Sequence, residues 1–183
     1  MLPSLVADVA AGTAATASSA LQAESASAAA LVARLAFSSP ERVAEEPGVL
    51  PALVAAVAAS SPAALPDLQS AALISTEALI NMTLTSTELA RRVGEEPDAL
   101  RALFATVEAG NAADNPELRC TAAASTRALA EMSSVGPDFG RRVAKEPGAL
   151  RALVAAVEAG SAADDAPELQ CAAMASAGAL ALL

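Results

Sequence analysis

The sequence contains no histidine, no tryptophan and no tyrosine, and only three phenylalanines among its 183 residues. Histidine is the side chain best suited to proton transfer near neutral pH and a common zinc ligand, so its absence excludes His-based catalysis and His-containing metal sites. Basic residues are also few, because 11 Lys and Arg stand against 21 Asp and Glu, for a net charge of -10. Nucleic acids and anionic membrane surfaces are both bound through Lys and Arg. The composition therefore argues against both classes of partner.

Long hydrophobic runs without interruption are missing as well. The longest uncharged stretch, residues 47–66, reads PGVLPALVAAVAASSPAALP and is long enough to span a membrane, but prolines and serines break it. The corresponding segments later in the chain carry charges such as Arg101 and Arg151. The first twenty residues have an apolar run and small residues, yet they lack a basic start and include Asp8. We therefore expect no membrane insertion, and we interpret the first twenty residues as part of a repeat.

Alanine and leucine dominate what is present. Hydrophobic residues make up 54% of the chain, and most of them are Ala. Ala is the best helix former because it loses no side-chain entropy in a helix. Proline and glycine gather between the Ala- and Leu-rich runs, which indicates an all-helical protein.

Four apolar quartets recur along the chain at nearly constant distance. Within each quartet the residues stand at i, i+3, i+4 and i+7, the stripe of an amphipathic helix. The first residues of successive quartets, Leu2, Leu50, Leu100 and Leu150, lie 48, 50 and 50 positions apart. The quartets are Leu2, Leu5, Val6 and Val9; Leu50, Leu53, Val54 and Val57; Leu100, Leu103, Phe104 and Val107; and Leu150, Leu153, Val154 and Val157.

A second, longer stripe follows each quartet, with the spacing i, i+4, i+7, i+11, i+14 of one helical face. A looser first copy begins at Leu21 and reaches Leu35. The spacing predicts a long helix after each quartet helix. The three regular stripes are Leu68, Ala72, Ser75, Leu79 and Met82; Leu118, Ala122, Ser125, Leu129 and Met132; and Leu169, Ala173, Ser176, Leu180 and Leu183.

A short segment precedes each of the last three quartets. These segments contain PERVAEE, LARRVGEE and FGRRVAKE and stop at Pro47, Pro97 and Pro147. Proline disfavours helix in the residue before it and is tolerated in a first turn, so each proline is expected to end a short helix and begin the quartet helix. The loops ASSPAALPD, AGNAADNPE and AGSAADDAPE, with Asp or Asn near Pro, predict the starts of the long helices.

The repeating unit is thus a short, a middle and a long helix in about 50 residues, and it resembles the armadillo repeat. The matching segments are EEPDALRALFATVE and KEPGALRALVAAVE for the middle helix, and PELRCTAAASTRALAEM and LQSAALISTEALINM for the long one. HEAT repeats are the nearest alternative, and the three-helix count favours armadillo. The resemblance implies one all-α domain over residues 1–183, a right-handed α-solenoid with a partial unit at 1–37 and complete units at 38–84, 85–134 and 135–183.

Stacking explains why the chain repeats itself. One unit cannot bury its apolar faces alone, whereas stacked copies share a continuous core. Neither end shows an obviously polar capping face, which fits a fragment of a longer chain or ends that a partner covers.

The two cysteines, Cys120 and Cys171, occupy the same position in successive long helices. Neighbouring helices lie roughly 8–10 Å apart, beyond the span of a disulfide, so we expect small half-buried thiols, with a redox pair as the alternative. This favours a reducing, intracellular compartment: the cytoplasm first, with the nucleus or an organelle left open.

The many carboxylates indicate a solvated surface. They stand at helix starts and in loops, whereas catalytic carboxylates need a pocket with contrasting environments. We expect ion pairs at i, i+4 on the short helices, and no catalytic, cofactor-binding or metal-binding residues. The expected pairs are Arg42–Glu46, Arg91–Glu95, Arg92–Glu96 and Arg142–Glu146.

Armadillo proteins that bind extended peptides do so along their long helices, in a concave groove with a ladder of Asn residues. The corresponding columns here read Asn81, Glu131 and Leu182, and, one turn earlier, Glu77, Arg127 and Gly178. Only Asn81 fits the ladder, so regular main-chain recognition is not expected. Glu77, Asn81, Arg127 and Glu131 remain as a polar patch of mixed charge and as the candidate binding site.

The sequence therefore predicts a non-enzymatic interaction module that holds a protein or peptide partner against the face formed by its long helices. The alternative is a structural segment of a larger armadillo chain or assembly, which contacts its neighbours, or further copies of itself, through its uncapped ends.

Overall fold

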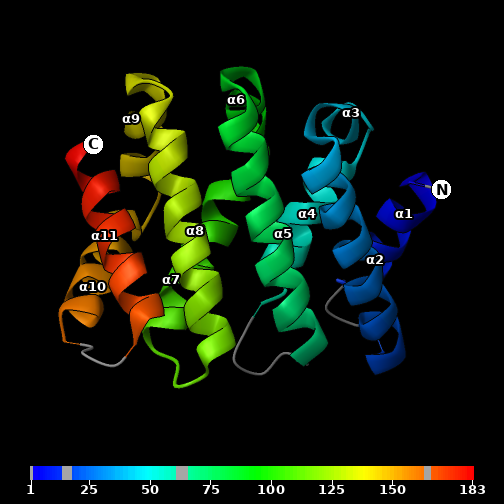
Figure 1. Ribbon diagram of the computed structural model, residues 1–183, viewed down its shortest axis with the longest axis horizontal. Coiled ribbons are helices and arrows are strands. Elements are labelled where there is room, and N and C mark those ends of the chain that lie inside the picture. Colours follow the sequence, from blue (N-terminus) through cyan, green and yellow to red (C-terminus); the bar gives the residue numbers. More distant parts are fainter. Residues whose placement is uncertain (1, 14–17, 61–65, 163–165) are drawn as a thin grey trace.

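The computed structural model describes residues 2–13, 18–60, 66–162 and 166–183. Within these ranges the regular structure is entirely helical and no strand occurs, which confirms the predicted all-α class (Figure 1). The helices in chain order are α1 (Leu2–Gly12), α2 (Ser19–Ser38), α3 (Pro40–Ala44), α4 (Val49–Ala58), α5 (Pro66–Thr85), α6 (Thr87–Glu95), α7 (Ala99–Asn111), α8 (Pro116–Ser134), α9 (Pro137–Lys145), α10 (Ala149–Ser161) and α11 (Pro167–Ala181).

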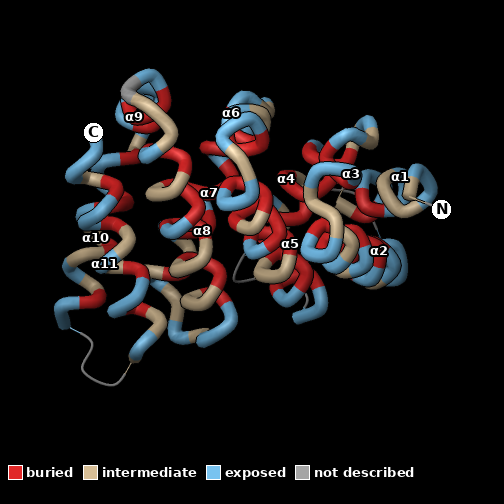
Figure 2. The backbone as a smooth tube through the Cα atoms, turned by 45° about the horizontal axis from the view of Figure 1, so that its top comes forward, coloured by how far each residue is buried: buried red, intermediate tan, exposed pale blue. Residues whose placement is uncertain are grey.

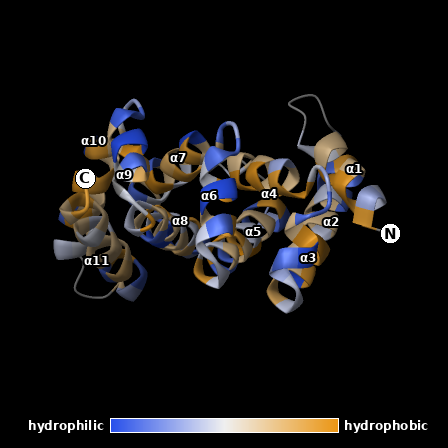
Figure 3. Cartoon of the chain, turned by 90° about the horizontal axis from the view of Figure 1, so that it is seen from above, coloured by the Kyte–Doolittle hydropathy of each residue, from blue (hydrophilic) through white to orange (hydrophobic). Residues whose placement is uncertain are grey.

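The helices form two layers that run across the molecule in chain order. The long helices α2, α5, α8 and α11 lie side by side, each packed against the next (Figure 1). Behind them α1, α4, α7 and α10 make the second layer, and each contacts the long helix that follows it. The short helices α3, α6 and α9 line one edge of the molecule, and α6 and α9 are its most hydrophilic segments (Figure 3).

The expected units correspond to sets of helices in this arrangement. The ranges 38–84, 85–134 and 135–183 each hold one short, one middle and one long helix, with α5 reaching one residue further, to Thr85. The range 1–37 holds α1 and nearly all of α2.

The middle helices begin differently from what the prolines suggested. Each starts two residues after its proline, and the residue between them has a positive φ: Gly48 at 86°, Asp98 at 63° and Gly148 at 83°. This left-handed residue turns the chain from the short helix into the middle helix. The prediction that proline itself begins the middle helix was therefore wrong, because the reversal needs a residue outside the right-handed region.

The start of α8 has the expected form. Asn115 is its N-cap, with the side-chain oxygen accepting from Glu117 N at 2.8 Å, and Pro116 occupies the first turn. The comparable carboxylates before α11, Asp164 and Asp165, lie outside the described residues.

The core lies between the two layers (Figure 2). The second and third quartets are completely buried, whereas the first is half-buried except for Val9. In the fourth quartet only Leu153 is fully buried, and Leu150 and Val154 are exposed. Burial of the same stripe thus depends on whether a further pair of helices covers it.

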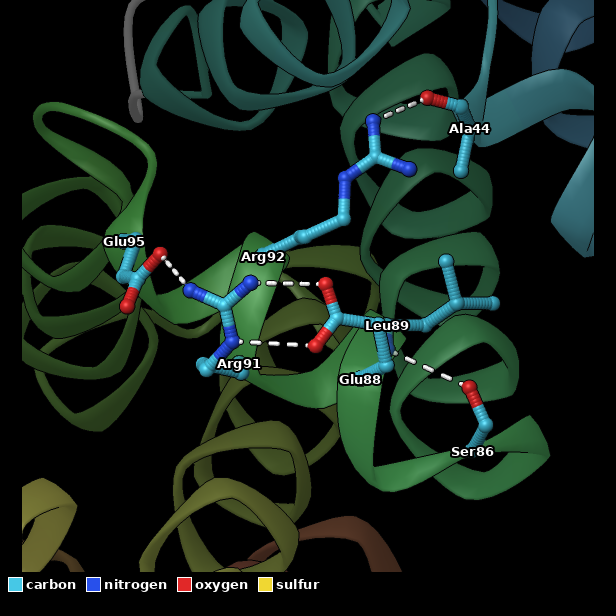
Figure 4. Close-up of polar contacts among 7 residues, drawn as sticks. All are labelled: Ala44, Ser86, Glu88, Leu89, Arg91, Arg92 and Glu95. Carbon is cyan, nitrogen blue, oxygen red and sulfur yellow. Dashed lines mark hydrogen bonds and ion pairs between the residues drawn. The ribbon is translucent and has the colours of Figure 1, made fainter.

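Only one of the four expected i, i+4 ion pairs forms in the described structure. Arg91 binds Glu95, and it also binds Glu88 one turn earlier (Figure 4). Arg92 instead donates a hydrogen bond across units to the carbonyl oxygen of Ala44, at the end of α3.

The other two expected pairs, Arg142–Glu146 and Arg42–Glu46, do not form in the described structure. The guanidinium of Arg142 lies 5.4 Å from the ring centroid of Phe139, while Glu146 is 3.9 Å from Arg101 of the preceding unit. For Arg42 no ion pair is found within the described structure. The three predictions were wrong because i, i+4 spacing permits an ion pair but does not exclude other contacts, such as Ala44 for Arg92 and the Phe139 ring for Arg142.

Both cysteines are free thiols. Cys120 is half-buried as expected, whereas Cys171 is exposed, because no described helix packs against that side of α11. The expectation of two half-buried thiols was wrong for Cys171.

Candidate partner-binding groove

A surface depression of about 320 Å³ lies across the long helices α2, α5 and α8. We call it the groove; the residues that line it are Phe37, Glu77, Ile80, Asn81, Leu84 and Arg127. Three of the four residues singled out from the sequence are therefore brought together in one place.

Helical periodicity places the central wall of the groove. Glu77, Asn81 and Leu84 stand at i, i+4 and i+7 on α5, so they form one stripe along that helix. Phe37 comes from the last turn of α2 and Arg127 from the middle of α8. Because α2, α5 and α8 pack side by side, the groove crosses three successive units.

The polar groups of the groove differ in how they are held. The Nδ2 of Asn81 donates to the backbone oxygen of Ala36 on α2 at 3.3 Å, and the side chain is half-buried. Glu77 and Arg127 are exposed, and neither forms a hydrogen bond or ion pair within the described part of the chain. Asn81 thus joins α5 to α2, while the two charged side chains remain open to an incoming molecule.

Sequence reasoning missed the apolar wall of the groove. Phe37 and Leu84 are 46% and 51% exposed, and Ile80, which also lines the groove, is buried. A signal was present, since the first long stripe precedes the second by 47 residues, and the same offset relates Phe37 to Leu84. Two large apolar residues therefore recur at one repeat position on the face that carries Glu77 and Asn81.

Glu131 is the predicted residue that does not line the groove. It lies half-buried on α8, one turn beyond Arg127. The sequence register placed Asn81 beside Glu131, whereas the structure directs the Asn81 amide toward α2. The 47-residue offset also assigns Arg34, exposed on α2, to the Asn81 position.

The Cys120 thiol lies near the start of α8, seven residues before the groove residue Arg127. Partial burial raises the pKa of Cys120, and the negative charges of Glu168, Glu77 and Glu117 raise it further. Carboxylates from α5, α8 and α11 therefore act together on the first turns of α8.

Metal binding and membrane spanning can also be judged from the described residues. No group of three or more Cys, Asp or Glu among them is arranged to hold a metal ion. Of the described helices, none combines the length and the apolar character needed to cross a membrane.

Comparison of the chain with protein families, with curated proteins and with solved structures finds no match.

Proposed function

We propose that the chain is an armadillo-like, right-handed α-solenoid that binds a protein or peptide partner through the groove. The sequence repeat of about 50 residues and the two layers of helices in chain order support the solenoid. The observation that carries the binding role is the groove itself, in which exposed large apolar side chains stand beside two charged side chains that have no polar partner among the described residues. The role is non-enzymatic, in a reducing intracellular compartment.

The lining of the groove defines the chemistry of the partner. Phe37 and Leu84 offer an apolar wall for one apolar side chain, such as Leu or Met. Glu77 and Arg127, on adjacent helices, suit a basic and an acidic group respectively. The partner segment therefore carries an apolar residue next to a basic one, with an acidic group further toward α8, and it lies across the long helices.

Selection from a displayed library of random peptides tests this proposal directly. We expect the selected peptides to share an apolar residue next to a basic one. In fluorescence anisotropy, Leu84→Ala should raise the dissociation constant of a selected peptide about tenfold, as expected for the loss of one apolar contact. The paired variant Glu77→Ala with Arg127→Ala should slow association and reduce its dependence on salt, because exposed charges act mainly on encounter.

A matched control uses a second pair of opposite charges on the other layer. Arg151 of α10 and Glu108 of α7 form an exposed ion pair at 3.2 Å, so replacing both by Ala removes the same charges outside the groove. Peptide binding should be unchanged in that variant. If the control loses binding while the groove variants keep it, the partner occupies the other face and the proposal is wrong.

A further inference from the structure

The groove offers few groups that could bind the main chain of a partner. Its three apolar residues have no polar side-chain atoms, and all lining residues stand beyond the first turn of their helices. Their main-chain N–H groups are therefore bonded within α2, α5 and α8. The amide Nδ2 of Asn81 is also engaged, because it donates to the carbonyl oxygen of Ala36 at 3.3 Å. Among the lining residues this leaves the guanidinium of Arg127 as the one donor.

Neighbouring repeats do not supply the missing donors. The repeat position of Asn81 is occupied by Arg34 on α2 and by Glu131 on α8, and neither of them lines the groove. An extended segment pressed against the apolar wall would lose water from its main-chain carbonyl groups without gaining a donor. Each main-chain group left unpaired would weaken binding about tenfold or more. The groove is therefore poorly suited to an extended segment.

A helical segment avoids this cost because a helix forms its own main-chain hydrogen bonds. Only its side chains then need partners, and the groove supplies these. Phe37 and Leu84 form an apolar wall, while Glu77 and Arg127 provide one charge of each sign. A groove that holds an amphipathic helix receives side chains spaced i, i+3 or i+4, and i+7 along that helix.

The dimensions of the groove fit such a stripe. Glu77 and Leu84 are seven residues apart on α5, which is roughly 10 Å along the helix axis. Arg127 holds the repeat position of Glu77 on α8, and adjacent helices lie roughly 8–10 Å apart. The apolar wall and Arg127 are thus separated by roughly 14 Å. Residues i and i+7 of a helix are roughly 10 Å apart, so they cover this span with the reach of their side chains.

We propose that the partner of the groove is an amphipathic helix of about three turns, with an apolar residue at i, a basic residue at i+3 or i+4 and an acidic residue at i+7. The apolar residue packs on Phe37 and Leu84, the basic one faces Glu77, and the acidic one faces Arg127. On one face of a helix the apolar and the basic residue are next to each other, although three or four positions separate them in the sequence.

Three labelled peptides of about 14 residues test the conformation by fluorescence anisotropy. The first, built on Ala and Gln, carries Leu, Lys and Glu at i, i+4 and i+7. The second is the same peptide with a central proline on its opposite face, which prevents helix formation. The third carries Leu, Lys and Glu at i, i+2 and i+4, which all share one face only in an extended chain. We expect the first to bind, and the dissociation constants of the other two to be at least about tenfold higher.

Two further measurements show where and how the first peptide binds. Leu84→Ala should raise its dissociation constant about tenfold. Replacement of both Arg151 and Glu108 by Ala, on the other layer, should leave that constant unchanged. Transferred nuclear Overhauser effects should show contacts between residues i and i+3 of the bound peptide, as in a helix.

The helical partner rests on the proposed binding role of the groove, and the outcomes separate the two. The helix alone is overturned if the second or third peptide binds as tightly as the first and loses affinity in Leu84→Ala. The same conclusion follows if peptides selected from the random library bind the groove and the first peptide does not. Binding that Leu84→Ala leaves unchanged, or no binding by any of these peptides, would overturn both the helix and the groove.

Discussion

Asp98 has a left-handed backbone at a repeat position where the other two copies have glycine. Its φ of 63° corresponds to 86° at Gly48 and 83° at Gly148, and a residue with a Cβ costs about 1–2 kcal/mol in the left-handed region. The Asp98 carboxylate pairs with Arg101 at 2.9 Å, but both side chains are largely exposed, so the pair contributes little. We expect Asp98→Gly to raise the free energy of unfolding by about 0.5–1 kcal/mol in urea titrations.

Gly148→Ala is the reciprocal control. It introduces a Cβ at φ 83° and should lower the free energy of unfolding by about 1 kcal/mol. If Asp98→Gly and Gly148→Ala have the same free energy of unfolding, backbone strain at this repeat position does not determine the stability of the protein.

Gly94 on α6 is required by packing and not by its backbone angle. A Cβ at Gly94 would lie 1.9 Å from Cε2 and Cζ of Phe139, a buried ring on α9. Overpacking a filled core costs about 1–3 kcal/mol, so Gly94→Ala should lower the free energy of unfolding by that amount.

Gly136→Ala is the matched control for that variant. No described atom lies within 4 Å of a Cβ at Gly136, and its backbone is extended. We expect Gly136→Ala to leave the free energy of unfolding nearly unchanged. A decrease as large as that caused by Gly94→Ala would contradict the packing argument.

Glu88 is the exposed carboxylate most affected by a neighbour. The hydrogen bonds from Arg91 lower its pKa below the ordinary value of 4.5 (Figure 4). Because the folded pKa lies below the unfolded one, the stabilisation is fully present above about pH 4.5 and is lost as the pH falls through the folded pKa. NMR titration of the Arg91→Gln variant should show the Glu88 pKa moving up toward 4.5; an unchanged pKa would exclude Arg91 as the cause.

Among the elements, α1 and α10 are the two middle-layer helices whose apolar stripes are incompletely buried. Leu2, Leu5 and Val6 are half-buried, whereas the corresponding residues of α4 are buried, because α1 has a neighbouring middle helix on one side only. We expect the amides of α1 and α10 to exchange faster than those of α4 and α7, as measured by hydrogen exchange with mass spectrometry. Equal protection of α1 and α7 would contradict the neighbour argument.

At the scale of the whole molecule, each layer consists of the same helix type repeated in chain order. Repeated stacking with a constant small rotation produces a superhelix, and we predict that it is right-handed. A crystal structure tests the hand directly, and a circular dichroism spectrum tests the helical content. A left-handed stack, or a spectrum with substantial β signal, would refute the armadillo-like arrangement.

Much of the fold could be predicted from local pattern. The stripe Leu100, Leu103, Phe104 and Val107 has helical spacing, and its recurrence 50 residues later predicts a second helix of the same kind. Glu77 and Asn81 could be placed on one face for the same reason. These inferences hold because helix formation and amphipathic spacing depend on residues within a few positions of one another.

The remaining features depended on contacts between units, which no local pattern contains. Arg92 bonds to Ala44, 48 residues away, and Asn81 bonds to Ala36, 45 residues away. Leu150 repeats the pattern of Leu100, yet one is exposed and the other buried. The sequence by itself thus determined the helices and their repeat, while the tertiary structure decided which copies of each stripe are covered, because burial depends on the neighbour that packs against a face.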